Sequence, residues 1–360
     1  MNPEILVPAA DPILVHWGWF KIFLIITFMC HILLMNIMVG SGIMAMFTGF
    51  KREKKPALLP FQADISKKLP IVIALAINFG VAPLLFLQVI YGQFIYVSFQ
   101  LMAVYWLSVI GLLIIAYYSA YYYKSDFHTT DGLKKYLMAV AVLIFLFIGF
   151  LFTNSMTLML NPKAWFGYFN TPDGTLLNLS DPTLIPRYLH FMTASVAVGG
   201  LFTAVVWTLK HKKGIAGAEA HITRGMRWFT YATLLQVLIG FWFQMSLPGE
   251  IMMRFMGGSA FHTGVFALGL FLVVQTLFFS ITRQVWPTTA SLLILVLNMI
   301  VMRDLVRTAY LSPYFRVSDL EIIGQVSPLI LFLASLVTGI GIIVYVIRLA
   351  LKTPAAASDI

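Results

Sequence analysis

Four histidines of this 360-residue chain lie in or beside long apolar segments: His16, His31, His190 and His262. Ionisable side chains are costly in a membrane and are usually functional there. A neutral imidazole binds haem iron through one nitrogen while the other keeps a hydrogen-bond partner. The histidines therefore indicate haem ligation, and the alternative for each is a structural hydrogen bond to a neighbouring helix. For His16, which precedes Trp17, that alternative is at least as good.

The positions of the histidines decide which of them could share one iron. His190 and His262 fall at comparable depth near the outer ends of their segments, so they could ligate one haem from opposite sides. His16 and His31 are fifteen residues apart, about 22 Å along a continuous helix, and cannot share one. His31, about a dozen residues into its segment, would ligate a second haem, with a partner from another helix or with an open position.

Three arginines on the same side could hold haem propionates, because a guanidinium group matches a carboxylate with two hydrogen bonds. Arg187 lies three residues before His190 and on the same helical face. Arg303 and Arg307 lie one turn apart. The alternative is that these arginines anchor helix ends at the membrane interface, with Asp304 pairing locally.

Nine apolar segments must position these side chains. The chain is 60% hydrophobic and 11% charged, with a mean hydropathy of +0.89. Such a composition excludes a soluble globular fold and a disordered chain, because a soluble domain could not cover its surface. We predict one all-α membrane domain over 1–360, a bundle of about nine transmembrane helices. The segments lie at roughly 19–49, 69–97, 101–123, 134–160, 186–209, 222–247, 260–282, 286–306 and 327–350.

Basic residues concentrate in alternate connections, which predicts the orientation of the bundle. The first segment is too long for a signal peptide and has no basic start, so we expect it to be retained. The pattern places the N-terminus outside and the C-terminus in the cytoplasm, and it explains the net charge of +10 without nucleic acid. His128, His211 and His221 fall in the same connections and are expected to be solvated. The basic residues concerned are Lys51, Arg52, Lys54, Lys55, Lys67, Lys68, Lys124, Lys134, Lys135, Lys210, Lys212, Lys213, Arg224, Arg227, Arg283, Arg348 and Lys352.

Several other features limit the chemistry. The single cysteine, Cys30, excludes a disulfide framework, an iron–sulfur cluster on the chain's own cysteines and covalent c-type haem. No Asp or Glu falls inside a predicted span, and Asp304 sits at the end of one. Segment 161–185 carries aromatic and turn residues and is expected to form a structured interfacial loop that could dock a partner. Glycines 40, 42, 199 and 200 would allow close approach of helices or of a macrocycle.

The segments around the histidines resemble subunit I of the cytochrome bd quinol oxidases, in chain order over most of the nine helices. Residues 30–40, CHILLMNIMVG, are similar to the family's first-helix segment, whose histidine ligates an active-site haem. Residues 187–195, RYLHFMTAS, with Gly199 following, look like the segment whose histidine ligates low-spin haem b. Further likenesses are NFGVAP at 78–83, QVIYG at 88–92, TNS at 153–155, LNP at 160–162 and VRT at 306–308.

This resemblance implies that His190 ligates a low-spin haem b and His31 a second haem. The family's other low-spin ligand is a methionine on its seventh helix. Here His262 falls in the corresponding region, so ligation by two histidines is implied. The chain lacks the family's Gly-Arg-Gln-Pro-Trp motif and the glutamate ligand near it. It also lacks the carboxylates of the third helix and most of the quinol-binding loop, of which about 247–259 remains. These departures argue against oxygen reduction.

The sequence thus predicts a cytochrome b-type subunit of the inner (cytoplasmic) membrane, with two or more haems b. It would transfer electrons between quinone or quinol and a partner, such as a periplasmic c-type cytochrome or another redox subunit on the outer face. It would be the electron-transfer subunit of a quinone-linked oxidoreductase complex in a respiratory chain. One alternative is a bd-type terminal oxidase subunit that reduces oxygen. The other is a haem-free transporter or membrane scaffold.

Overall fold

The computed structural model describes residues 3–50, 58–125 and 136–352, with side chains up to 349. The described chain is an all-α bundle whose only β-bridge joins Ile13 to Ile322. The prediction of a helical membrane bundle is confirmed. The long helices are α1 (Trp17–Gly49), α2 (Leu59–Leu101), α3 (Ala103–Ser125), α4 (Leu137–Leu160), α5 (Leu184–Lys212), α6 (Ala218–Met245), α8 (Ala260–Ile281), α9 (Val285–Leu311) and α10 (Ser327–Lys352). Shorter ones are η1 (Pro3–Leu6), η5 (Pro162–Phe169), α7 (Gly249–Met253), the π-helix η6 (Arg254–Gly258) and η7 (Val317–Asp319).

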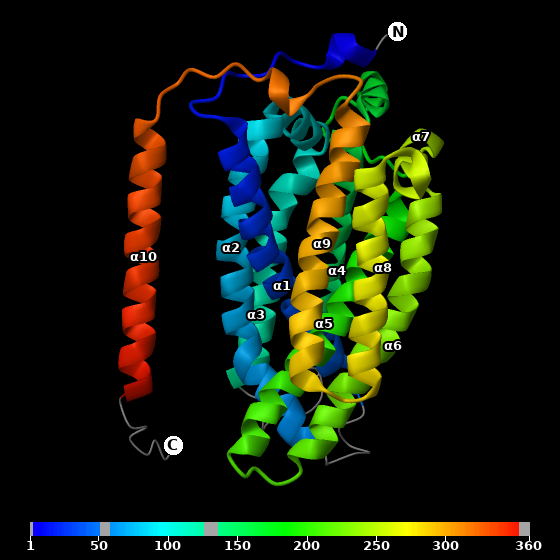
Figure 1. Cartoon of the computed structure of the whole chain (residues 1–360). Coiled ribbons are helices and arrows are strands. Elements are labelled where there is room, and N and C mark those ends of the chain that lie inside the picture. Colours follow the sequence, from blue (N-terminus) through cyan, green and yellow to red (C-terminus); the bar gives the residue numbers. More distant parts are fainter. Residues whose placement is uncertain (1–2, 51–57, 126–135, 353–360) are drawn as a thin grey trace.

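Eight described helices are long and apolar enough to cross a membrane, and α6 is the long helix that falls outside this group. Figure 1 shows α6 running beside α5 and α8 over the height of the bundle. It also places η1 at the upper end and the end of α10 at the lower end. An even number of crossings would return the chain to its starting end. We therefore count α6, with 28 residues, as the ninth crossing.

Two helices are longer than the hydropathy pattern predicts. Helix α2 begins at Leu59 and α9 ends at Leu311, so Asp64 and Asp304 both lie within helices. Asp64 lies before the predicted span 69–97 and Asp304 at the end of 286–306, so the expectation that no carboxylate lies inside a span stays a prediction. Each acid is paired: Asp64 with Lys68 and Lys210, and Asp304 with Lys21 and Arg307. Neutralised acids lower the cost of extending a helix past them.

Glycines bring three helices into backbone contact, as the sequence predicted. A Cβ on Gly40 of α1 would lie 1.8 Å from the carbonyl oxygen of Ser195 on α5. A Cβ on Gly199 would lie 2.6 Å from the carbonyl carbon of Gly40. On the other side of α5, a Cβ on Gly200 would lie 2.8 Å from the carbonyl oxygen of Gly225 on α6. Close backbone approach of this kind is a main source of helix association in membranes, where no hydrophobic effect drives it.

Helix α10 stands apart from the other helices on the side of α1 and α2 (Figure 1). Its apolar span is 0% buried. Its ring contacts with the bundle are those of Phe332, whose centroid lies 5.1 Å from Phe23 and 6.0 Å from Phe86. The surface of α1 and α2 that faces α10 is therefore left largely uncovered by it.

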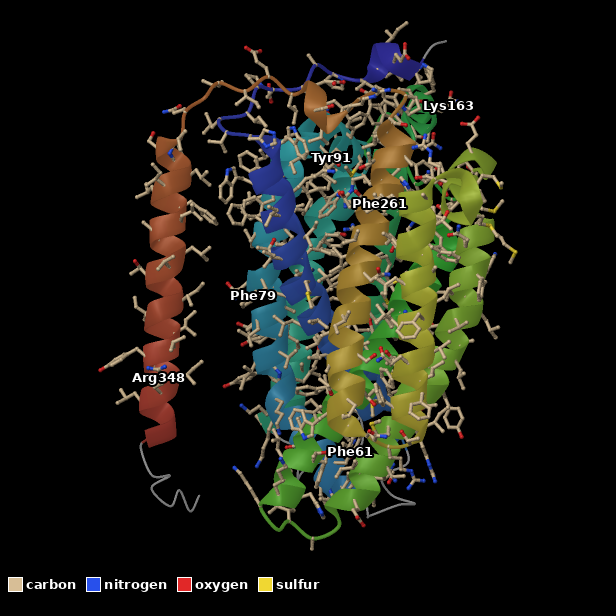
Figure 2. All side chains as sticks on the ribbon, viewed as in Figure 1. Phe61, Phe79, Tyr91, Lys163, Phe261 and Arg348 are labelled. Carbon is tan, nitrogen blue, oxygen red and sulfur yellow. The ribbon has the colours of Figure 1, made fainter. Side chains whose placement is uncertain are left out.

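The upper end of the bundle is capped by ordered connections. Loop 161–185 begins with η5, in which the buried Trp165 donates a hydrogen bond from Nε1 to the carbonyl oxygen of Leu158 at 2.8 Å. Asp173 accepts hydrogen bonds from the backbone N–H and the hydroxyl of Thr175, chiefly the latter, and these lower the pKa of its carboxyl. Lys163 projects at this end (Figure 2). The prediction of a structured loop is confirmed, and docking of a partner on it remains a prediction.

Several predicted topology residues lie outside the described part of the chain: Lys51, Arg52, Lys54, Lys55, His128, Lys134 and Lys135. The side chain of Lys352 is also outside it. Of the described basic residues of the lower end, Lys210 lies in the last turn of α5 and Arg283 beyond the end of α8, whereas Lys68 and Arg227 lie inside α2 and α6. The direction of the bundle relative to the two sides of a membrane stays a prediction.

Candidate functional site

A cavity of about 250 Å³ lies between α1, α5, α6, α8 and α9. A cavity that holds one buried water has a volume of only about 10–15 Å³, so this cavity is far larger than a water site. The lining on α9 runs from Leu292 to Val306, fourteen residues or about 21 Å along the helix. Most of the lining is apolar. Its polar members are Asn36, Arg187, His190, Thr233, Gln236, Gln244 and Arg303.

His190 is the only histidine among the residues that line this cavity. Its Nε2 lies 3.4 Å from the side-chain nitrogen of Gln236, and its Nδ1 is buried without a hydrogen-bond partner. Gly240 on α6 makes room for the ring, because a Cβ there would lie 3.3 Å from Cε1 of His190. An imidazole with an unsatisfied buried nitrogen is costly in an empty protein and is explained when a further group binds beside it.

Arg187 and Arg303 form the cationic upper end of the cavity. Arg187 is 7% exposed, donates from Nη2 to the hydroxyl of Thr183 at 3.3 Å, and leaves Nε buried without a partner. The guanidinium of Arg303 lies 4.3 Å from the ring centroid of Phe28 and contacts the sulfur of Met156. Within the described part of the chain, neither arginine lies within 4 Å of a carboxylate oxygen. Arg187 is buried and Arg303 half-buried, and two such cations with no carboxylate in contact favour an anionic group beside them.

Arg307 is placed differently from the other two arginines. It is 5% exposed, does not line the cavity, and donates to Asp304 at 3.1 Å, while Asp304 also pairs with Lys21 of α1 at 3.0 Å. The local pairing of Asp304 is therefore confirmed. Whether Arg307 also holds a propionate remains a prediction.

Replacing Asp304 with asparagine should destabilise the bundle by about 3 kcal/mol or more, because it leaves Lys21 and the buried Arg307 unpaired. Thermal unfolding of the purified chain in detergent would measure the loss. Asp173→Asn is the matched control, because that carboxylate lies on the exposed loop and contacts only Thr175. Equal unfolding temperatures for the two variants would show that the ion group contributes little.

The other predicted histidine ligands lie away from the cavity lining. His262 begins α8, contacts the hydroxyl of Ser259 through Nδ1 at 2.9 Å, and packs 5.2 Å from the ring of Phe255. It lies one turn above Phe266, which does line the cavity. His31 lies between α1 and α2, where Nδ1 is 3.0 Å from the carbonyl oxygen of Ala76.

His16 caps the start of α1. Its Nδ1 accepts a hydrogen bond from the backbone N–H of Gly18 at 3.1 Å, and its ring is exposed beside Trp17. Among the described residues, no group of three His, Cys, Asp or Glu side chains gathers as a metal cluster would. Of the four histidines, His190 is thus the one that the fold places in a cavity.

His221 is not solvated, contrary to the sequence-based expectation. It is 7% exposed, stacks on the ring of Phe61 at 5.9 Å, and lies tilted against the ring of Trp207 at 4.1 Å. The early start of α2 brings Phe61 into place beside the first turn of α6. His211, by contrast, is exposed as expected.

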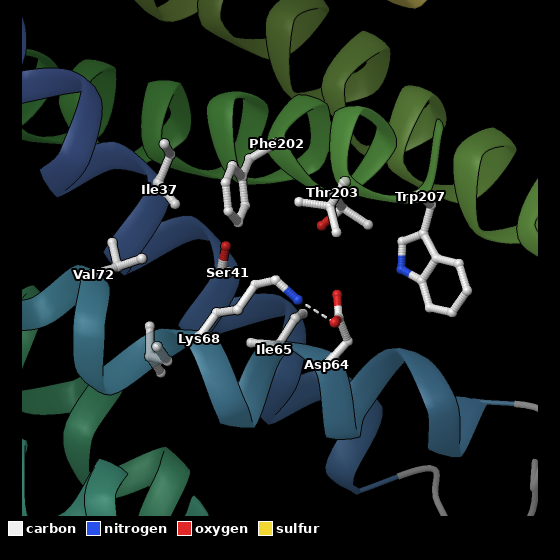
Figure 3. Close-up of a pocket in the computed structure, with 11 residues that line it drawn as sticks. Ile37, Ser41, Asp64, Ile65, Lys68, Val72, Phe202, Thr203 and Trp207 are labelled. Atoms are coloured by element: carbon white, nitrogen blue, oxygen red, sulfur yellow. Dashed lines mark hydrogen bonds and ion pairs between the residues drawn. The ribbon is translucent and has the colours of Figure 1, made fainter. Parts of the chain in front are cut away.

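A second polar cluster lies near His221 and was missed in the sequence. Asp64 pairs with Lys68 on α2 (Figure 3), and also with Lys210 on α5 at 2.8 Å. Trp207, Thr203 and Ser41 line the same small pocket, whose volume of about 10 Å³ is that of one water. The spacing of Asp64 and Lys68, four residues apart, was the available signal. The ion pair between Asp64 and Lys210 links the lower ends of α2 and α5. The pocket beside it is too small for a ligand larger than one water.

No protein-family model, curated protein or solved structure matches the chain. The resemblance to the cytochrome bd subunit therefore stays a prediction from the residues quoted above.

The cavity combines a histidine with an unpartnered nitrogen, one buried and one half-buried arginine, and an apolar body. That combination suits a planar apolar group with anionic substituents, because the body would be desolvated and the anions would meet the arginines. Haem b has this character, and His190, Arg187 and Arg303 fit it. Sequence reasoning named all three. The place of Gln236, Asn36 and Gln244 in the cavity was not readable from the sequence.

Proposed function

We propose that this multi-pass membrane protein is a cytochrome b-type subunit that passes electrons between quinone or quinol and a partner redox protein. His190 would ligate a haem b in the cavity, and Arg187 and Arg303 would bind its propionates. The bound haem would supply one-electron transfer. The chain itself supplies the ligand, the charge at the upper end and an apolar body that excludes water.

The single observation that supports this proposal most is the set of unsatisfied groups in one cavity. Nδ1 of His190 and Nε of Arg187 are both buried without partners, and Nε2 of Gln244 is a third such atom. Buried polar atoms are nearly always satisfied in native proteins. Three of the ten buried, unpartnered side-chain atoms of the described chain thus belong to residues that line one apolar space, where a cofactor would complete a site.

The finer parts of the proposal concern other residues. His262 is proposed as the second ligand of the His190 haem, although it would have to leave Ser259 to reach the cavity. His31 is the candidate ligand of a further haem, and Arg307 a further propionate contact. His16 is the weakest candidate, because its ring already caps α1. We also propose the inner (cytoplasmic) membrane as the location and the upper loops as the face for a c-type cytochrome or another redox subunit.

The test is a visible spectrum of the purified full chain, dithionite-reduced minus oxidised, with a pyridine haemochrome count. A low-spin b spectrum with little response to carbon monoxide is the expected result. Strong binding of carbon monoxide would indicate an open iron and favour an oxygen-reducing oxidase. Intact folded protein without haem would overturn the proposal and leave a transporter or a scaffold.

Arg303→Gln should lower the midpoint potential of the haem in the cavity by tens of millivolts. The reason is that a nearby positive charge in a low-dielectric site favours the reduced, more negative haem. A redox titration of the α-band would measure the shift. Lys163→Gln removes a charge from the exposed upper loop and is the matched control. Equal potentials for both variants would show that Arg303 does not lie beside the haem.

A further inference from the structure

His31 lies at the seam between α1 and α2 with a fixed proton arrangement. Its Nδ1 is 3.0 Å from the carbonyl oxygen of Ala76. A carbonyl oxygen only accepts hydrogen bonds, so Nδ1 carries the proton, and Nε2 of the neutral ring is a bare acceptor. No described residue hydrogen-bonds Nε2, and it is not among the sealed unpartnered atoms. The ring therefore offers one accessible acceptor.

The accessible side of this ring belongs to the membrane-facing surface of the seam. His31 is half-buried and lines neither cavity described above. Its chain neighbour Cys30 is exposed, and Phe79 of α2 is 45% exposed at mid-height of the bundle (Figure 2). The ring packs against Gly80, where a Cβ would lie 2.9 Å from Cε1 of His31.

The seam is open to the bilayer because α10 does not cover it. The span of α10 is 0% buried, and Phe332 meets α1 and α2 near the upper end through Phe23 and Phe86. Phe23 lies eight residues before His31, about 12 Å higher along α1. A lipid-soluble molecule could thus approach His31 laterally, below an aromatic group formed by Phe23, Phe86 and Phe332.

We propose that this seam binds the ring of a membrane quinol, with Nε2 of His31 accepting a hydrogen bond from one quinol hydroxyl. The apolar surroundings disfavour a charged ligand, and a neutral ring with hydroxyl donors matches a lone acceptor. Phe28, which lines the cavity, has its ring 6.5 Å from that of His31. One side chain therefore separates the seam from the cavity. The inference rests on the proposed function, because it places that function's electron donor, and it assigns His31 this role instead of ligation of a further haem.

The test uses Cys30, which is the only cysteine of the chain and is exposed beside His31. Alkylation of Cys30 by N-ethylmaleimide would be followed anaerobically on the full chain in detergent, with decylubiquinol or decylubiquinone. The ring of this probe is fully substituted and does not add to thiols. Quinol should slow alkylation several-fold. Quinone, which has no hydroxyl to donate, should need about tenfold higher concentration for the same protection, the value of one hydrogen bond.

Variants assign the effect to His31. His31→Leu should raise the quinol concentration needed for protection by about tenfold, whereas His31→Gln keeps an acceptor and should retain most of it. The control is Ile110→Cys in a Cys30→Ser background. Ile110 is 63% exposed on α3, and quinol should not protect a thiol there.

Equal protection by quinol and quinone in the unmodified chain would overturn the proposal, and this comparison needs no variant. Loss of one haem equivalent in His31→Leu would also overturn it, since His31 would then be an iron ligand. The assay does not depend on haem. If folded protein without haem still shows quinol-specific protection of Cys30, the proposed electron transfer is contradicted and the quinol site is supported.

Discussion

Replacing His190 with alanine is expected to remove one full equivalent of haem b from the purified protein. The imidazole is the one histidine ligand that the cavity lining offers, so its loss leaves the iron without an anchor on α5. Reduced-minus-oxidised spectra and a pyridine haemochrome count would measure the loss. Adding free imidazole to His190→Gly should restore part of the low-spin spectrum, because the small ligand can occupy the vacated space.

His211→Ala is the matched control for this experiment, because His211 is exposed at the lower end and should keep the full haem content. Circular dichroism would show that both variants keep their helices. His262→Ala then tests the second ligand. If it changes the spectrum to high spin while haem content is kept, His262 coordinates the same iron. Full haem in His190→Ala would show that the cavity is not a haem site through this residue.

Gly40→Leu is expected to prevent stable folding of the bundle, and even Gly40→Ala should cost about 3 kcal/mol or more. The first side-chain carbon would lie 1.8 Å from the carbonyl oxygen of Ser195, and that backbone cannot move without separating α1 from α5. The same seam holds the hydrogen bond from the Ser195 hydroxyl to Asn36 at 2.8 Å. Separation would therefore also disturb the cavity wall. Thermal unfolding in detergent and the monodisperse yield would measure the effect.

Gly111→Ala is the control, because nothing lies within 4 Å of a Cβ at that position on α3. We expect an unchanged or slightly raised unfolding temperature there, since alanine favours the helix over glycine. Gly199→Ala should behave like Gly40→Ala, because it meets the same contact from α5. If Gly40→Ala unfolds at the same temperature as Gly111→Ala, the close approach of α1 and α5 is not required for stability.

The sequence alone determined the architecture. Long apolar segments predict membrane helices because a span needs about 20 apolar residues, and the nine segments correspond to the nine long helices, with ends that differ mostly by a few residues. The largest difference is at the start of α2. Hydropathy stops at charged residues, whereas the helix continues past Asp64 because Lys68 and Lys210 pair with it. A hydropathy pattern along the sequence does not show that a basic residue of another helix will pair with an acid.

The sequence also named the chemical types of the candidate site, since His190, Arg187 and Arg303 are polar residues in apolar segments. Only the tertiary structure decided which of these residues meet. His190 and His31 have the same residue type and similar surroundings in sequence, yet the first faces a cavity and the second faces the α1–α2 seam. His221 looked solvated and packs against two aromatic rings. The reason is that the rotation of each helix about its axis is set by packing with its neighbours, and that rotation decides whether a side chain faces lipid, a neighbouring helix or a cavity.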